Sequence, residues 1–383
     1  MTAREELRQL HGRAFIDGAV RDDVLIVVSG NSISQVLQSS KPPAAAERVA
    51  GVLVPGFIDV HVHGGDGADF MDADRSATER VLRFHATHGT TALLATTLSA
   101  SPGNLRSAVQ TVIDVRSKMP SGAEVAGIHL EGPFVNRDRA GAQDRASIRG
   151  ADITELHALV DQAPELRWLV TVAPEAEGVL ALIEHFRDQV VFSIGHTAAS
   201  HAEAVAALAS GASHFTHLYN AMSGLHHRDP GVVGAAFTSL DATAELIADG
   251  IHVHPVALRI AATILSGRTV LVTDAMRACG MPEGNYRLYD YDVTMTDGAA
   301  RLGDGTLAGS VLTMDAAVRN MIELAGLPFE AVIPMATSVP ARLAGVAGRK
   351  GVLAEGYDAD LVLLDERAQV QRVWARGVEV SGF

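Results

Sequence analysis

The chain begins with short apolar runs separated by turn residues, and the same pattern occurs at its end. Residues 13–38 contain RAFIDG and DVLIVVSGNSISQVLQ, a pattern typical of hairpin-like β structure. Residues 351–380 repeat it with GVLAEGYDADLVLLD and QRVWARGVEV. Because chain termini often lie close together, we expect residues 1–54 and 346–383 to build one small β-sandwich domain.

Residues 55–345 alternate strand-like and amphipathic segments. Eight strands with helices between them predict a (β/α)8 TIM-like barrel, an α/β fold. A doubly wound open sheet is the alternative, but no glycine-rich dinucleotide fingerprint follows the first strand. The expected strands are 52–59, 90–97, 124–131, 167–173, 190–195, 213–218, 244–250 and 269–274. The expected helices include 78–88, 104–118, 153–162 and 201–210.

Composition narrows the class of protein. Apolar residues make up 48% of the 383 positions and charged residues 20%, which is enough for a large core. The net charge of −14 argues against nucleic acid or an anionic membrane as a partner. The lone cysteine, Cys279, excludes an intramolecular disulfide and a thiolate zinc cluster. Without a signal-like or membrane-spanning apolar run, we expect a cytoplasmic protein.

Residues able to bind a metal recur at the ends of the expected strands. On a strand, residues i and i+2 face the same side, so His61 and His63 can converge on one ion. Among 16 histidines, one such pair arises by chance, and His252 and His254 form a second. The prediction of a metal site therefore depends on the whole series of strand-end residues. That series comprises His61, His63, Glu131, His196, His217, His252 and Asp274.

Histidine and carboxylate ligands favour a borderline cation such as zinc or iron. Such an ion lowers the pKa of bound water from about 15.7 toward about 7. Amide hydrolysis then needs a base for the water proton and an acid for the departing amine. We expect Asp274 to do both, because it completes the series at the eighth strand.

Several motifs identify a family. PGFIDVHVHG, HLEGPF, SIGHT, THLYNAM, VTDAM and LAGS together resemble the N-acetylglucosamine-6-phosphate deacetylase family of the amidohydrolase superfamily. The resemblance covers nearly the whole chain. It implies deacetylation of N-acetyl-D-glucosamine 6-phosphate to glucosamine 6-phosphate and acetate, in amino-sugar metabolism or cell-wall recycling. Metal-bound hydroxide would be the nucleophile, with Asp274 as general base and then general acid.

The resemblance also implies the metal ligands. One or two divalent ions per subunit are expected, with Zn2+ ahead of Fe2+, Co2+ or Mn2+. Some relatives keep a single ion because their first motif lacks a histidine, whereas this chain has both histidines. The principal ion would be held by Glu131, His196 and His217. The second would be held by His61, His63, Glu131 and Asp274.

A lysine is not available as a bridge between two ions. Related amidohydrolases use a carboxylated lysine after the fourth strand for this purpose. The three lysines here are Lys41, Lys118 and Lys350, and none lies at an expected strand end. Glu131 is therefore the remaining candidate for the bridge.

By the same resemblance, several residues would contact the sugar phosphate. Arg228 would reach in from a neighbouring subunit, which implies a homodimer. Gln143 replaces a histidine that many relatives carry, and it offers an amide donor without charge. The expected substrate contacts are Ala142, Gln143, Asn220, Ala221, Arg228, His252, Leu307, Ala308 and Gly309.

Other functions remain open at this point. A deaminase, or an amidohydrolase acting on a different N-acetyl sugar, would need the same metal ligands. A catalytically silent relative that serves as an oligomeric scaffold is the third possibility. Such a relative would be expected to have lost ligands, and this chain retains every one that the resemblance implies.

Overall fold

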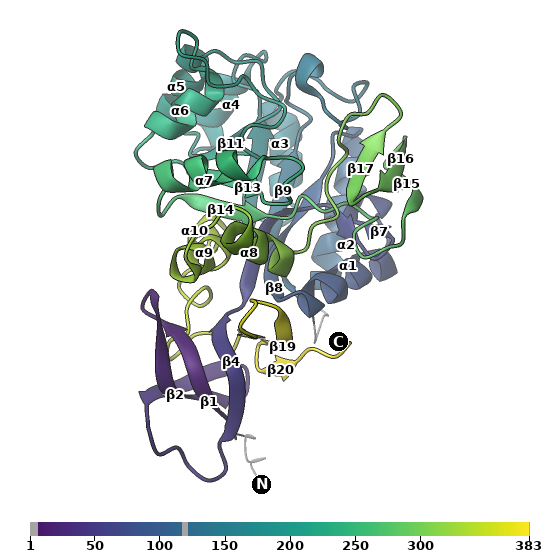
Figure 1. Cartoon of the computed structure of the whole chain (residues 1–383). Helices are drawn as coiled ribbons and strands as arrows, with labels where there is room; N and C mark the ends of the chain where they lie inside the picture. Colours follow the sequence, from purple (N-terminus) through teal and green to yellow (C-terminus); the bar gives the residue numbers. More distant parts are fainter. Residues whose placement is uncertain (1–6, 117–121, 383) are drawn as a thin grey trace.

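The middle of the chain forms a nearly closed parallel barrel in the computed structural model, which describes residues 7–116 and 122–382 (Figure 1). Eight strands follow the order β14-β13-β12-β11-β10-β9-β8-β5. The two edges meet where the amide of Asp274 donates to the carbonyl of His61 at 2.8 Å. The strands are β5 (Phe57–Val62), β8 (Thr90–Thr97), β9 (Glu124–Glu131), β10 (Arg167–Val172), β11 (Val191–Ile194), β12 (His214–Phe215), β13 (Thr243–Ile247) and β14 (Thr269–Val272).

Helices surround this barrel, and capping residues fix where several of them begin. Asp74 caps the first helix by accepting from the amide of Ala77, and Ser200 forms a capping box with Glu203. The helices are α1 (Arg75–Thr87), α2 (Pro102–Arg116), α3 (Ile153–Val160), α4 (Val179–Phe186), α5 (His201–Ser210), α6 (Gly231–Thr238), α7 (Pro255–Ile264), α8 (Met314–Glu323), α9 (Phe329–Ala336) and α10 (Ser338–Leu343). Short 3-10 turns occur at η1 (Phe70–Asp72) and η2 (Arg137–Arg139).

Both ends of the chain build a separate seven-stranded sheet in the order β20-β19-β18-β4-β1-β2-β3. In Figure 1 the purple amino-terminal strands lie beside the yellow carboxyl-terminal strands, below the barrel. Leu53 pairs with Leu363 where the two ends meet, and Trp374 is buried in the core of this domain. The strands are β1 (Leu7–Ile16), β2 (Ala19–Ser29), β3 (Ser32–Gln38), β4 (Glu47–Pro55), β18 (Leu361–Leu364), β19 (Val370–Ala375) and β20 (Val378–Glu379).

A buried ionic cluster joins the small domain to the barrel. The Lys350 ammonium lies 2.5 Å from Asp360, 2.9 Å from Asp358 and 3.1 Å from Glu124. Burial alone would raise the pKa of Glu124, but Arg349 and Lys350 together lower it to about 2. Because Glu124 begins β9 and Glu131 ends it, this cluster lies at the opposite end of the barrel from Glu131.

The expected barrel with a small β domain from both termini is confirmed, but three details differ. The expected strand 52–59 is wrong, because the apolar run VLVPGFIDV is divided between two strands. Its first part belongs to β4 in the small domain and its last part to β5 in the barrel. A three-stranded sheet follows β14 and was not predicted: β15 (Gly284–Leu288), β16 (Tyr291–Thr296) and β17 (Ala299–Leu302). A two-stranded ribbon, β6 (Gly64–Gly65) with β7 (Ala68–Asp69), follows β5.

Other expectations fall at the limits of the structure. The end of the expected helix 104–118, with Lys118, lies outside the described residues. The domain boundaries at 54/55 and 345/346 stay a prediction; β4 ends at Pro55 and α10 at Leu343. Within the described ranges, no helix combines the length and apolar character that crossing a bilayer requires.

Candidate metal centre

The carboxyl ends of five barrel strands bring six ligand-type side chains together. His61 lies in β5 and Glu131 ends β9, while the others follow their strands by one or two residues. The backbone turns sharply there, since His196, His217 and Asp274 have φ of 45°, 30° and 48°. Left-handed conformations cost non-glycine residues about 1–3 kcal/mol and concentrate at functional sites. The six residues are His61, His63, Glu131, His196, His217 and Asp274.

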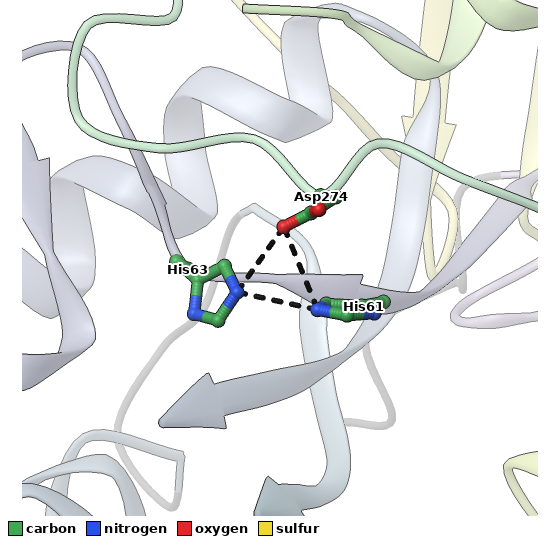
Figure 2. A group of neighbouring side chains, drawn as sticks. All are labelled: His61, His63 and Asp274. Atoms are coloured by element: carbon green, nitrogen blue, oxygen red, sulfur yellow. Dashed lines mark hydrogen bonds and ion pairs between the residues drawn. The ribbon is translucent and has the colours of Figure 1, made fainter. Parts of the chain in front are cut away.

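One group consists of His61, His63 and Asp274, whose side chains point toward a common centre (Figure 2). The two Nε2 atoms are 3.2 Å apart. The Asp274 Oδ1 atom is 3.2 Å from His63 Nε2 and 3.5 Å from His61 Nε2. All three side chains are buried, so these donors are shielded from bulk water.

The second group consists of Glu131, His196 and His217. Glu131 Oε1 lies 3.1 Å from the Nε2 atom of each histidine, and those two nitrogens are 3.0 Å apart. Glu131 also reaches the first group, with 3.3 Å from Oε1 to His61 Nε2 and 3.4 Å from Oε2 to His63 Nε2. Its carboxylate therefore touches both groups, as the bridging expectation requires.

These spacings match the chemistry of a metal site. Nitrogen and oxygen ligands at about 2.05 Å from a tetrahedral ion lie about 3.3 Å from one another. The observed distances between ligand atoms run from 3.0 to 3.5 Å. Imidazole nitrogens that face each other so closely are natural lone-pair donors to one cation. The residues present therefore fit a divalent metal.

The pKa shifts of the ligand residues show that the carboxylates of the site favour positive charge at its centre. Burial alone would lower the pKa of His61, but Glu245, Glu131 and Asp274 raise it well above its ordinary value. Burial likewise opposes protonation of His63, yet Asp274 and Glu131 raise its pKa to about 9. Burial favours the neutral acid at Asp274, while His61 and His63 hold its pKa below the ordinary value. Asp274 is thus a carboxylate at neutral pH.

Glu245 is a site residue that the sequence analysis missed. It lies inside β13, is fully buried, and has its Oε2 atom 2.9 Å from His61 Nδ1. The same oxygen accepts the backbone N–H of His217 at 2.9 Å, and Oε1 lies 3.1 Å from His214 Nε2. A signal existed, because a carboxylate inside the apolar strand TAELI must find buried partners.

Other buried polar groups beneath the centre are internally paired. His129, inside β9, lies 2.8 Å from the Thr171 hydroxyl and 3.1 Å from the Val60 carbonyl. Burial lowers its pKa to about 3, so it is neutral. Asp59 accepts from the Thr273 hydroxyl at 2.6 Å, and burial raises its pKa to about 7. The buried thiol of Cys279 has a raised pKa from burial, which makes it unreactive.

A cavity of about 820 Å³ opens in front of both groups. Most of the expected substrate contacts line it, while Ala308 is buried just beside it. Arg228 does not line the cavity of its own chain; it is exposed and its Nη1 donates to His227 Nε2 at 2.7 Å. The expected residues that line the cavity are Ala142, Gln143, Asn220, Ala221, His252, Leu307 and Gly309.

Gln143 has both ends of its side-chain amide engaged. Its Nε2 donates to Glu131 Oε2 at 2.5 Å, and its Oε1 accepts from the Ser99 amide at 2.6 Å. The expected contact of Gln143 with the substrate stays a prediction. What the structure adds is a direct contact with the bridging candidate Glu131.

The cavity lining carries charged residues that the sequence analysis did not consider. Arg139, Arg145 and Arg301 line the cavity, together with Asp138 and Asp304. Arg301 lies on β17, in the sheet that was not predicted. The three arginines are exposed and supply positive charge to the cavity of an acidic protein.

The chain is similar to known proteins over nearly its full length. The Amidohydrolase family profile matches residues 52–380. An N-acetylgalactosamine-6-phosphate deacetylase of Escherichia coli O157:H7 is 41% identical, covering 88% of this chain and 89% of the relative. An N-acetylglucosamine-6-phosphate deacetylase of Bacillus subtilis is 42% identical, covering 85% of this chain and 84% of the relative.

Solved structures show the same similarity. An aspartate-to-alanine mutant of N-acetyl-D-glucosamine-6-phosphate deacetylase from Mycobacterium smegmatis, in complex with N-acetyl-D-glucosamine-6-phosphate, superposes with a TM-score of 0.92 at 34% identity. That match covers 99% of this chain and 100% of the other. The Pasteurella multocida enzyme of the same name gives a TM-score of 0.93 at 26% identity, covering 98% and 100%.

Proposed function

The chain belongs to the amidohydrolase family, and we propose that it deacetylates N-acetyl-D-glucosamine 6-phosphate to glucosamine 6-phosphate and acetate. The relatives confirm the family resemblance drawn from the motifs. The observation that carries the proposal is the pair of ligand groups joined by Glu131 at the floor of a cavity of about 820 Å³. That volume is in the range of small-molecule sites.

The metal is proposed to be Zn2+, with two ions per subunit, because nitrogen and oxygen ligands suit it. Fe2+, Co2+ and Mn2+ accept similar ligands and are the alternatives. When bound, a divalent metal polarises the acetyl carbonyl and lowers the pKa of water toward about 7. His196, His217 and Glu131 would hold the principal ion. His61, His63 and Asp274, with Glu131, would hold the second.

Asp274 would move the proton. The water oxygen bonds to the acetyl carbon, and its proton passes to the Asp274 carboxylate. The carbon–nitrogen bond then breaks, and the same proton goes to the amine of the sugar. The lowered pKa of Asp274 supports its role as the base, because the group is ionised before the reaction begins.

The phosphate would be held by Asn220, the backbone of Ala221 and His252, whose Nδ1 lies 2.6 Å from Asp249 Oδ2. Arg228 would complete the site of a second copy in a homodimer. Its exposure and its absence from the lining of its own cavity support this placement. Ala142, Gln143 and residues 307–309 would surround the sugar ring and the acetyl group. Phosphorylated sugars are intracellular metabolites, so we place the reaction in the cytoplasm.

The homodimer is tested by mixing two inactive variants, Arg228→Ala and Asp274→Asn. In a mixed dimer, the chain with intact Asp274 receives Arg228 from its partner and regains one complete site. Equal mixing with random exchange should restore about a quarter of the wild-type activity at low substrate concentration. Activity no greater than the sum of the separate variants would contradict the shared site.

The reaction itself is tested by acetate release from N-acetylglucosamine 6-phosphate. Activity should vanish after chelation and return with Zn2+, Fe2+ or Co2+, and unphosphorylated N-acetylglucosamine should turn over poorly. N-acetylgalactosamine 6-phosphate is the second candidate substrate, because the E. coli relative of that name is 41% identical. Turnover of neither phosphorylated sugar with any of these metals would refute the proposal.

A further inference from the structure

The outer nitrogens of the four ligand histidines are supported unequally. His196 Nδ1 lies 2.7 Å from the backbone carbonyl of Arg139. The Nδ1 atoms of His63 and His217 are buried and have no hydrogen-bond partner among the described residues. His61 Nδ1 faces the carboxylate of Glu245 at 2.9 Å. His61 is thus the one among these four whose outer nitrogen meets a formal charge.

Glu245 makes contacts in three directions. One oxygen faces His61 Nδ1 and also accepts the backbone N–H of His217, so it touches a residue of each ligand group. The other oxygen faces His214 Nε2 at 3.1 Å, and His214 Nδ1 lies 2.6 Å from the Thr243 hydroxyl. The side chains of Glu245, His61 and His214 are all fully buried.

Stability does not explain this arrangement. Taking a carboxylate out of water costs several kcal/mol, and apolar replacements of buried ion pairs are often neutral or stabilising. An apolar residue at position 245 would fit the remainder of β13, whose neighbours Ala244, Leu246 and Ile247 are buried. The presence of a buried carboxylate at position 245 therefore indicates a role at the metal centre.

We infer that Glu245 is a positioning residue, which holds His61 with its proton on Nδ1 so that Nε2 is free to bind the metal proposed above. A carboxylate at the outer nitrogen fixes the tautomer and ring orientation and makes the inner nitrogen more basic. Glu245 selectively strengthens the group of His61, His63 and Asp274. Its bond to the backbone of His217 sets the distance between the two groups.

The variant Glu245→Gln separates charge from shape. The glutamine carbonyl can still accept from His61 Nδ1 and from the His217 amide. Its amide N–H can donate to His214 Nε2 once the His214 proton moves to Nδ1, where the Thr243 hydroxyl accepts it. The framework is therefore preserved and only the negative charge is lost. The variant Glu245→Leu removes the charge and the hydrogen bonds together.

The experiment measures stepwise Zn2+ affinity of the metal-free full-length chain by competition with a chromophoric chelator. Absorption spectra of the Co2+-loaded chain report the ligand geometry. Losing an outer partner of a ligand costs about 10- to 100-fold in metal affinity. Glu245→Gln should weaken one binding step by about 10-fold and leave the other unchanged, with a larger loss in Glu245→Leu. Asp315→Asn is the matched control, because Asp315 faces His88 Nδ1 at 3.2 Å outside the metal centre.

Three outcomes would overturn the inference. Both variants could leave every binding step unchanged, or Glu245→Gln could weaken both steps equally, as a general loss of structure would. The wild-type chain could also bind a single ion with an affinity that Glu245→Gln does not alter. None of these readouts uses a substrate, so they are independent of whether the proposed deacetylation is correct.

Discussion

Replacing Asp274 with asparagine removes the proposed proton acceptor and, with it, one carboxylate ligand of the proposed second ion. The main-chain bonds that hold this position remain, since its amide donates to His61 and its carbonyl accepts from Ser310 at 2.7 Å. The side chain keeps its volume but can no longer take a proton. Glu131, His196 and His217 do not depend on Asp274, so the principal ligand group stays intact. The fold and one metal should therefore survive.

The size of the effect follows from the lost step. General acid–base catalysis contributes about 100- to 10,000-fold. At 1.36 kcal/mol per factor of ten, that is about 3–5 kcal/mol of activation free energy. Because the role proposed for Asp274 is on the reacting atoms, the loss should fall on kcat, while KM for N-acetylglucosamine 6-phosphate changes little.

Acetate release under saturating substrate measures this directly, with metal content determined on the same sample. Asp304→Asn is the control, because Asp304 is an exposed carboxylate that lines the cavity but belongs to neither ligand group. A kcat for Asp274→Asn within tenfold of the wild type would refute the acid–base role. An increase in KM with kcat retained would instead place Asp274 in substrate binding.

Three further predictions concern other parts of the molecule. Gln143→Leu should weaken metal binding as well as turnover, because it removes the amide donor to Glu131 Oε2; unchanged metal affinity in a chelator titration would contradict this. Glu124→Gln should lower the free energy of unfolding at pH 7 by about 3 kcal/mol, since the pKa of Glu124 falls from 4.5 to about 2. This stabilisation is present above pH 4.5 and is lost as the pH falls toward 2, so urea titrations of the wild type and Glu124→Gln should differ at pH 7 and converge at low pH. The exposed control Glu165→Gln should match the wild type at both pH values. Chelation should lower the melting temperature reversibly, because a metal at 1,000 times its Kd contributes about 4 kcal/mol per site; a melting temperature insensitive to chelator would argue against a resident ion.

Local patterns predicted the bounds of two barrel strands correctly. The expected segments 90–97 and 124–131 are the observed bounds of β8 and β9. The segment 52–59 failed because a continuous apolar run can pass from one sheet into another, which no local pattern records. The sheet from Gly284 to Leu302 was missed because it packs on residues distant in sequence, including Leu98.

In the candidate site, too, local sequence patterns predicted some residues, while others depend on contacts distant in sequence. Glu131 ends β9 and Asp274 follows β14 by two residues, so the strand-end pattern predicted both. Glu245 lies within a strand, and its importance appears only when His61 is placed against it. In the proposed homodimer, the location of Arg228 relative to a substrate would depend on a second copy, which the sequence of one chain cannot place.

The pairing of β4 with β18 has a consequence for synthesis on the ribosome. β4 ends at Pro55 and β18 begins at Leu361, so 306 positions separate them. At about 5–20 residues per second, the first strands wait about 15–60 seconds for their partner. During that interval the edge of β4 is open, and open strand edges favour aggregation. Nascent chains that stall after Val272 and before Leu361 should therefore depend on chaperones, although all eight barrel strands have already been made.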